Sequence, residues 1–315
     1  MKITATFLDE ITWDIPHQNW GAAEWDRDFS AMKKMGIDTV VMIRSGLARW
    51  LAYPSTYLNR EYGCAIPDLD LIDLFLTLAE KHGMRFFCGT YVSQFFFRNG
   101  QPEKELELNL RSAEEVWRMY GKRKAFQGWY LSHEFSGQDG NIVELTSILG
   151  RRCKEISGGL PVLLSPFIRG CKEGNAWDPS IRNGRKSIDP AEHKKVWGTI
   201  LEQLRGAVDI VAFQDGHTDI FELEEYLKVN RALCESYGME SWTNCESFDR
   251  DMPIKFLPIH WEKMLYKLRA AERAGLTKAI TFEFSHFMSP NSMYQSAHGL
   301  YDRYCEYAGL NSTHE

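Results

Sequence analysis

Short runs of β-branched and aromatic residues alternate with longer amphipathic runs along the chain. The short runs have the length and composition of strands, and several are apolar at successive positions, as in parallel strands covered on both faces. The predicted strands begin at Ile3, Thr39, Arg85, Gly128, Pro161, Asp209, Ser241 and Ala279, and they read ITATFLD, TVVMIR, RFFCGTY, GWYLSHE, PVLLSPF, DIVAFQD, SWTNCESF and AITFEFS.

The longer runs predict helices, and several of them end in the same way. A charged or polar last turn is followed by a glycine and then by an apolar residue that enters the next strand, at Gly36, Gly83, Gly238 and Gly275. Glycine adopts the left-handed conformation that ends a helix. The sequence therefore predicts short connections from each helix to the next strand.

Eight successive strand and helix units favour one particular α/β fold. No glycine-rich phosphate loop follows the first strand, which favours a closed (β/α)₈ TIM barrel over a doubly wound sheet. We expect a single TIM-barrel domain over residues 1–315. Long links follow the second, third, fifth and seventh strands, at 45–67, 92–104, 168–189 and 249–257. In such barrels these βα loops surround the active site.

Composition and charge narrow the class of partner. The hydrophobic fraction of 44% and the charged fraction of 25% are typical of globular domains. A net charge of -6 provides no basic face for nucleic acid or for an anionic membrane surface. No apolar run approaches the ~20 residues of a membrane span. Neutral partners fit better, and the oligomeric state stays open.

The first residues and the cysteines bear on the compartment. The opening apolar run is broken by Asp9 and Glu10 and is too short for a signal peptide, so we expect a cytoplasmic protein as given. A leader removed before residue 1 would leave no trace in this sequence. The seven cysteines are widely spaced, without a CxxC pair, and predict buried free thiols in a reducing compartment.

Polar residues gather at the carboxyl ends of the predicted strands, where barrels place their active sites. For any one of them a solvated loop charge or a salt bridge is a sufficient explanation, but recurrence at several strand ends favours a site. They are Asp9 and Glu10 after the first strand, Arg44 after the second, His133 and Glu134 after the fourth, Gln214, Asp215 and His217 after the sixth, Asn244 and Glu246 on the seventh, and Glu283 and His286 on the eighth.

Two carboxylates in one cavity are suited to the cleavage of an acetal. Desolvation raises the pKa of one so that it is protonated, while the other stays ionised. In a retaining glycosidase the two carboxyls lie about 5–5.5 Å apart and one attacks the sugar, whereas an inverting enzyme keeps them about 6.5–9.5 Å apart to admit water.

The motifs GWYLSHEF and WTNCESF resemble the (β/α)₈ glycosidases of clan GH-A. Together with DIVAFQDG they resemble, more closely, an uncharacterised bacterial family of glycosidase-like barrels known only as a domain of unknown function. The resemblance implies that Glu134 is the acid/base and Glu246 the nucleophile. His133 stands where the clan usually has an asparagine, and Gln214 and Asp215 replace the aromatic or histidine that is common on strand six. Glu283 competes with Glu246 for the role of nucleophile.

Other residues are candidates for sugar binding. Sugars stack their CH faces on aromatic rings, and Trp13, Trp50 and Trp177 lie in the predicted βα loops, where packing of the loops themselves is the alternative. Arg44 either binds an acidic sugar or pairs with Asp9 or Glu10. The remaining candidates for contacts with sugar hydroxyls, or for tuning of the two glutamates, are Asp9, His133, Asp215, His217, Asn244, Glu283 and His286.

The expected function is a glycoside hydrolase of two-carboxylate, retaining type, acting on an oligo- or polysaccharide without a metal or cofactor. One alternative is a divalent-metal sugar isomerase or epimerase that uses Glu134, Asp215, His217 and Glu283 as ligands. Another is a carbohydrate-binding barrel without catalysis. The sequence leaves open the sugar, the linkage, endo or exo action and the stereochemical outcome.

Overall fold

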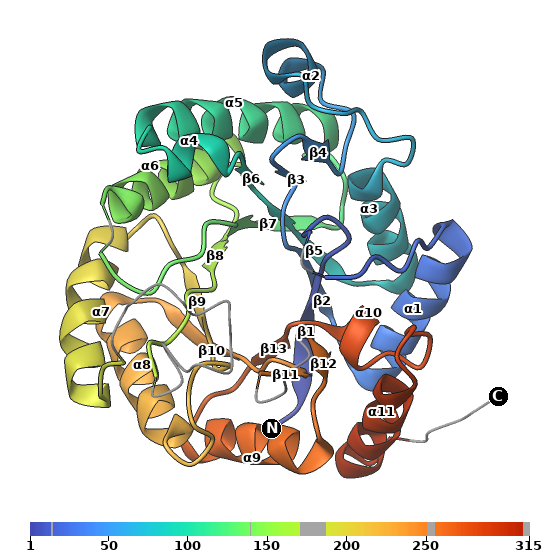
Figure 1. Cartoon of the computed structure of the whole chain (residues 1–315), viewed down its shortest axis with the longest axis vertical. Coiled ribbons are helices and arrows are strands. Elements are labelled where there is room, and N and C mark those ends of the chain that lie inside the picture. Colours follow the sequence, from blue (N-terminus) through green and yellow to red (C-terminus); the bar gives the residue numbers. More distant parts are fainter. Residues whose placement is uncertain (14, 139, 171–186, 251–255, 311–315) are drawn as a thin grey trace.

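A computed structural model describes residues 1–13, 15–138, 140–170, 187–250 and 256–310. Eight of its strands pair in parallel and close into a barrel, which confirms the predicted fold class (Figure 1). The barrel strands, in order around the barrel, are β1 (Ile3–Leu8), β2 (Thr39–Met42), β5 (Arg85–Gly89), β7 (Phe126–Leu131), β8 (Val162–Leu164), β9 (Ile210–Gln214), β10 (Glu240–Asn244) and β13 (Ala279–Thr281).

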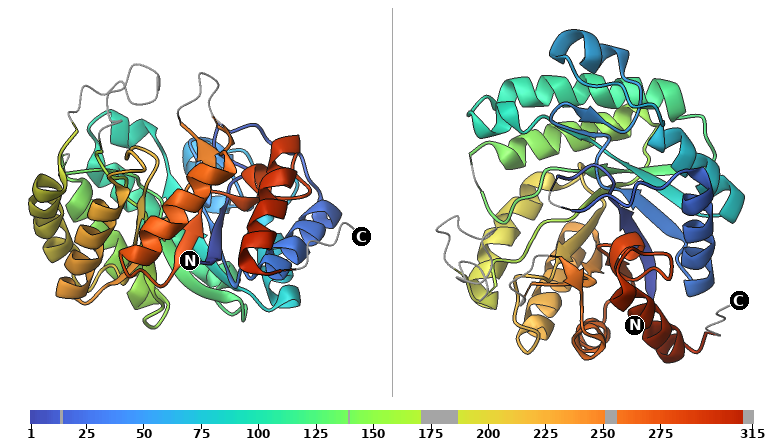
Figure 2. Two further views of the ribbon diagram at one scale, coloured as in Figure 1. Left: turned by 90° about the horizontal axis from the view of Figure 1, so that it is seen from below. Right: turned by 45° about the vertical axis from the view of Figure 1, so that its right-hand side comes forward.

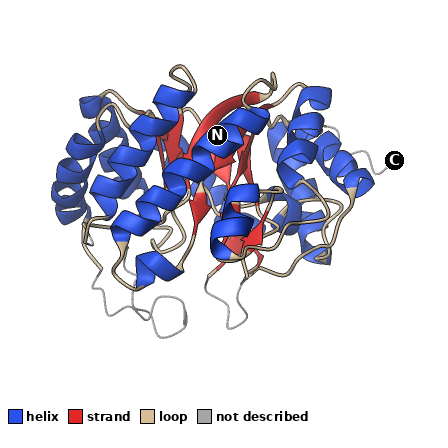
Figure 3. Cartoon of the chain, turned by 90° about the horizontal axis from the view of Figure 1, so that it is seen from above, coloured by secondary structure: helices blue, strands red, loops and turns tan. Residues whose placement is uncertain are grey.

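Helices surround the barrel, as the two further views show (Figure 2), and the strands lie inside them (Figure 3). They are α1 (Ala22–Met35), α3 (Leu71–His82), α5 (Pro102–Tyr120), α6 (Ile142–Ile156), α7 (Pro190–Leu204), α8 (Leu223–Tyr237), α9 (Trp261–Arg273) and α11 (Gln295–Ala308). In the described ranges, no helix is both long enough and apolar enough to cross a bilayer.

The predicted glycine stops are confirmed. Helices α1, α3 and α8 end at Gly36, Gly83 and Gly238, whose φ angles are 97°, 62° and 72°. Gly275 follows α9 and its φ is 78°. A residue with a Cβ atom is strained in this left-handed backbone conformation, whereas glycine is not. Each glycine therefore fixes the point at which the chain turns into the next strand.

The barrel strands bury both faces. Their outward side chains pack against the helices, with Trp25, Trp129 and Trp197 fully buried in this layer. The cysteines in the described part of the chain are all buried free thiols, as expected. Cys171 lies outside the described residues.

The βα loops at the carboxyl ends of the strands carry small elements of their own. A three-stranded sheet is formed there by β3 (Gly46–Leu47), β4 (Trp50–Leu51) and β6 (Tyr91–Val92). The remaining loop elements are α2 (Thr56–Tyr62), α4 (Phe95–Arg98), the antiparallel pair β11 (Phe248–Asp249) and β12 (Leu257–Pro258), and α10 (Phe284–Phe287). The loops are thus elaborated on the face where barrel active sites lie.

Four predicted strand ends were three or four residues too far along the chain, because the fourth, fifth, seventh and eighth strands end at Leu131, Leu164, Asn244 and Thr281 rather than at Glu134, Phe167, Phe248 and Ser285. The fourth strand ends at Leu131, so Glu134 follows it in a loop. The eighth strand was expected to run through Ser285 but ends at Thr281, because the Glu283 carboxylate accepts the backbone N–H groups of Ser285 and His286 and begins helix α10. An alternating pattern of aromatic residues concealed this helix cap.

Candidate active site

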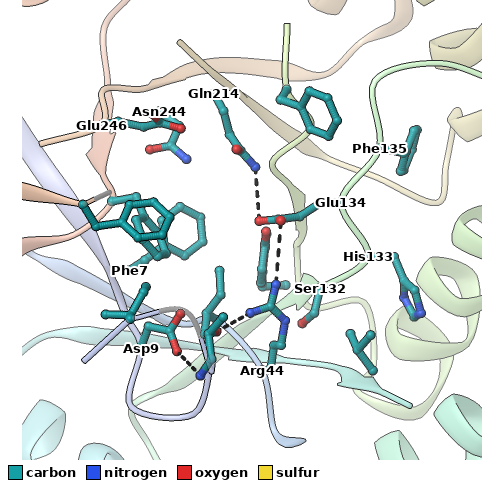
Figure 4. A pocket seen from close by; sticks show the side chains of 18 of the residues that line it. Phe7, Asp9, Arg44, Ser132, His133, Glu134, Phe135, Gln214, Asn244 and Glu246 are labelled. Carbon is teal, nitrogen blue, oxygen red and sulfur yellow. Dashed lines mark hydrogen bonds and ion pairs between the residues drawn. The ribbon is translucent and has the colours of Figure 1, made fainter. Parts of the chain in front are cut away.

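A cavity of about 520 Å³ opens at the carboxyl ends of the barrel strands (Figure 4). Aromatic rings form much of its floor and sides, including Phe7, Tyr130 and Phe282. Its polar lining comes from the last residues of β9 and β10, from the end of α4 and from loops beyond the barrel strands. It consists of Asp9, Thr12, Trp13, Arg44, Gln94, Arg98, Ser132, His133, Glu134, Gln214, His217, Asn244, Glu246 and Arg250. Glu134 and Glu246 therefore face one common space.

Glu134 follows β7 and points into the cavity. Its Oε1 accepts a hydrogen bond from Gln214 Nε2 at 3.2 Å, and its Oε2 lies 3.7 Å from Nη2 of Arg44 (Figure 4). The side chain is 36% exposed and lines the cavity. Desolvation by the surrounding protein raises the pKa of Glu134 and outweighs the opposing charges of Arg44 and Arg250.

Glu246 has very different surroundings. Its side chain is only 2% exposed, two residues beyond the end of β10. Nε and Nη2 of Arg250 donate to its two carboxylate oxygens at 2.8 Å each, a bidentate pair that fixes the orientation of the carboxylate. A Cβ at Gly216 would lie 1.8 Å from Oε2 of Glu246. Only glycine at position 216 leaves room for this ion pair.

Beneath Glu246 lies a buried ion pair that holds its backbone. Nζ of Lys267 lies 2.7 Å from Oδ1 of Asp215 and donates to the carbonyl oxygen of Glu246 at 2.8 Å. The same Asp215 oxygen accepts the backbone N–H of Glu246 at 3.1 Å. Burial raises the pKa of Asp215 to about 6 although Lys267 opposes this shift. Burial by itself lowers the pKa of Lys267. The negative charge of Asp215 outweighs this effect, so the pKa of the lysine is raised.

The role of Lys267 was missed by the sequence reasoning. In LYKLRAAER a lysine looks like an ordinary surface charge on a helix. The available signal was its spacing, since Met264, Lys267, Leu268 and Ala271 recur at the three- and four-residue intervals of one helix face, and this is the buried face of α9. Asp215, expected to contact a sugar, does not line the cavity and supports Glu246 instead.

His133 lines the cavity and is tied to a buried acid. Its Nε2 lies 2.9 Å from Oε1 of Glu105, which is fully buried on α5 and also accepts the backbone N–H of Ser93. Burial opposes ionisation of Glu105, but its contacts with His133 and Ser93 lower its pKa. The hydrogen bonds through Glu105 fix the position of the His133 side chain, next to Glu134 in the sequence. Sequence reasoning missed Glu105 because KELELNL looks like an ordinary amphipathic helix.

The other predicted ligands divide into two groups. Asp9, Arg44, His217 and Asn244 line the cavity, and Trp13 lies at its rim with 57% of its surface exposed. Arg44 contacts Glu134, and it donates to Thr12 Oγ1 at 2.5 Å rather than pairing with Asp9 or Glu10. Trp50, which is 69% exposed on β4, is not part of the cavity lining. Trp177 lies outside the described residues.

Glu283 and His286 also lie away from the cavity lining. Both are fully buried. Glu283 caps α10 and binds Nδ1 of His286, and His286 Nε2 lies 2.9 Å from the carbonyl oxygen of Pro16. Their polar atoms therefore connect α10 to the loop after β1.

The residues of the metal-dependent alternative are not gathered at one point. Glu134 faces the cavity, whereas Asp215 pairs with Lys267 and Glu283 pairs with His286. Across the described residues, no three His, Cys, Asp or Glu side chains converge in a way that would hold a metal ion. The geometry thus offers the two glutamates in one cavity and, among the described residues, no ready set of metal ligands.

Comparison with known proteins places the chain in a family. Residues 3–294 match DUF4434, a domain of unknown function. A crystal structure from Bacteroides thetaiotaomicron, described as a "putative alpha-L-fucosidase", is 50% identical with a TM-score of 0.93, and the match covers 98% of this chain and 94% of that one. Among proteins with curated descriptions, none matches.

More distant structures share the barrel fold. An endo-1,4-beta-D-mannanase from Thermotoga petrophila is 10% identical with a TM-score of 0.59, and the match covers 89% of this chain and 87% of that one. A beta-D-glucuronidase from Dictyoglomus thermophilum is 15% identical with a TM-score of 0.54, covering 97% of this chain and 50% of that one. At these identities the likeness concerns the fold alone. By its match over most of its length, the chain belongs to the DUF4434 family of domains of unknown function.

Proposed function

We propose that the protein is a glycoside hydrolase in which Glu134 is the general acid/base and Glu246 the nucleophile. The observation that carries this proposal is the pair itself: two glutamates, after the fourth and seventh strands of the barrel, face one cavity in unlike electrostatic surroundings. A catalytic pair of carboxyl groups needs this difference, because one must hold a proton while the other carries a charge.

The roles follow from the contacts. The raised pKa of Glu134 favours the protonated acid, which donates its proton to the leaving glycosidic oxygen. Glu246 carries the charge that Arg250 pairs, and its oxygen attacks the anomeric carbon to form a glycosyl ester. Arg250 donates one hydrogen bond to each oxygen of Glu246, so each oxygen keeps a second lone pair for the attack. Water, deprotonated by Glu134, then cleaves the ester.

The cavity also offers polar atoms suited to sugar hydroxyls. Oδ1 of Asn244, Oγ of Ser132 and the hydroxyl of Tyr130 are buried and have no hydrogen-bond partner in the described structure, and the same holds for Oδ2 of Asp9. Buried polar atoms are normally satisfied. Hydroxyl groups both donate and accept, and a bound sugar would satisfy these atoms. Aromatic rings in the lining, such as Phe167 and Phe282, supply the apolar surface that a sugar also needs.

The direct test is hydrolysis of a panel of aryl glycosides and oligosaccharides, including α-L-fucosides, with and without EDTA. We expect turnover that is unchanged by the chelator, and proton NMR of the first-formed sugar anomer is expected to show retention of configuration. Loss of activity with EDTA would favour a metal enzyme. Binding of oligosaccharides without turnover of any of them would favour the non-catalytic barrel.

The pH dependence provides a separate prediction. Glu134 must be protonated to act as the acid, so activity is expected to fall as pH rises through its pKa, which lies above the ordinary glutamate value of 4.5. A pH profile of kcat/KM measures this alkaline limb. On an aryl glycoside with an activated leaving group, the residual activity of Glu134→Gln is expected to lack the limb, and its persistence in the variant would assign it to another group.

A further inference from the structure

Arg98 is a cavity residue whose charge is not used by the proposed chemistry. It is the last residue of α4 and lines the same cavity as Glu134 and Glu246. Its guanidinium carbon lies 5.6 Å from the centroid of the Trp13 ring. Within the described ranges, no Asp or Glu side chain forms an ion pair with it.

The contact with Trp13 holds this cation at the rim of the cavity. A cation–π contact stabilises the guanidinium without an oxygen acceptor, so its N–H donors stay available. The planar fork of arginine matches the two oxygens of a carboxylate. Gln94, in the same wall, has a φ of 58°, an uncommon backbone conformation of the kind that clusters at ligand sites.

The balance of charge in the cavity also favours an anionic ligand. Its described lining holds three guanidiniums and three carboxylates. Arg250 pairs with Glu246, and Oδ1 of Asp9 accepts two backbone N–H groups. Arg44 approaches Glu134 only to 3.7 Å. When Glu134 carries the proton that an acid catalyst needs, the lining has one guanidinium in excess.

We infer that the cavity takes a glycan with a carboxylated sugar, a uronic acid, and that Arg98, held by Trp13, binds its carboxylate. This inference rests on the proposed function for the carbohydrate nature of the ligand. A neutral sugar offers this wall only hydroxyl groups, whereas a uronic acid fills the guanidinium fork and balances the excess charge. Arg98 is thus a specificity-determining residue, separate from the two glutamates.

Binding of matched sugars to the full chain tests this inference without any turnover. Ligand-observed NMR titrations would compare glucuronate with glucose, galacturonate with galactose, and both acids with L-fucose and glucose 6-sulfate. We expect each uronate to bind at least tenfold more tightly than its neutral partner, and to lose affinity as salt is added because the contact is ionic. Glucose 6-sulfate is expected to bind more weakly than glucuronate because its anion lacks the planar carboxylate geometry.

Substitution of Arg98 provides the discriminating variant. Arg98→Gln is expected to abolish the preference for uronates, and Arg98→Lys to restore only part of it. Arg111→Gln is the matched control, because Arg111 lies at the same 5.6 Å from a ring, that of Tyr57, but does not line the cavity. The control is expected to keep the preference.

The outcomes separate this inference from the proposed function. Equal affinity within each pair, including no binding of either member, would overturn it, as would tighter binding of L-fucose or of the sulfated sugar. A preference that survives Arg98→Gln would also overturn the assignment of that residue. Hydrolysis of neutral glycosides with no effect of Arg98→Gln would support the proposed glycoside hydrolase and contradict the inference that the ligand is a uronate. Uronate binding through Arg98 without hydrolysis of any glycoside would support the uronate inference and contradict the proposed glycoside hydrolase.

Discussion

Replacing Glu246 with glycine is expected to lower kcat by roughly 10⁴-fold or more on every substrate that the wild type cleaves. The reason is that the proposed nucleophile forms the bond to the anomeric carbon, and no other carboxylate in the described lining takes its place beside Arg250. The space left by the side chain admits a small anion. We therefore expect added formate to restore part of the activity, measured as initial rates on aryl glycosides.

The matching substitution Glu134→Gln is expected to depend on the leaving group. On natural glycosides the loss is expected to be about 10²- to 10⁴-fold, because the departing oxygen needs a proton. On aryl glycosides whose leaving group is already stable as an anion, the first step is expected to be nearly unaffected. Formate is not expected to restore hydrolysis of natural glycosides by this variant.

Glu283 serves as the control for the assignment of the nucleophile. It is fully buried and caps α10, so Glu283→Ala is expected to lower stability more than chemistry and to show no rescue by formate. Rescue of the Glu283 variant, together with full activity of Glu246→Gly, would overturn the assignment of Glu246.

The second large effect is expected from Lys267→Met, which removes one member of the buried pair under Glu246. The two side chains are 5% and 1% exposed. Breaking such a pair leaves an uncompensated charge, and we expect the free energy of unfolding to fall by about 3–5 kcal/mol. Urea denaturation of wild type and variant measures this loss. A loss within about 1 kcal/mol would show that the pair contributes little.

The double variant Asp215→Asn/Lys267→Met and the pH dependence separate charge from packing. Without a charge at position 215, the double variant is expected to be more stable than Lys267→Met alone. Loss of Lys267 also raises the pKa of Asp215 further, because the lysine opposes the effect of burial. The unfolded chain ionises Asp215 at its ordinary pKa of 3.8. Wild type and variant share this unfolded state, so the stability deficit of Lys267→Met is expected to grow as pH rises from about 6, the pKa of Asp215 in the folded wild type, towards the higher pKa of Asp215 in the folded variant, and to shrink on acidification below about 6.

Local patterns predicted much of the architecture. Strands such as TVVMIR and the helix stops at Gly36, Gly83 and Gly238 depend on residues next to one another in the chain, where propensity and backbone conformation act directly. The repeated alternation of strand and helix then restricts the fold to few arrangements, and the closed barrel is one of them. Residues at strand ends, including Glu134, Arg44 and Asn244, were placed at the cavity on the same grounds.

The tertiary structure decided which of these residues face the cavity and which support it. Asp215, Glu283 and Trp50 stand near strand ends or in loops as the sequence indicated, yet none lines the cavity. Glu283 caps helix α10, and Asp215 forms an ion pair with Lys267, which lies 52 positions later in the chain on α9. A pattern read along one chain does not encode such pairings.

What the sequence determined by itself is the set of elements, their order and the face on which polar residues collect, because these depend on periodicity and on local backbone preference. What only the tertiary structure decided is the electrostatic surroundings of each side chain. The raised pKa of Glu134, the bidentate contact of Arg250 with Glu246 and the position of Arg98 over Trp13 arise from separate loops that meet at the barrel mouth. Desolvation and charge act through space, and distance in space is set by the fold.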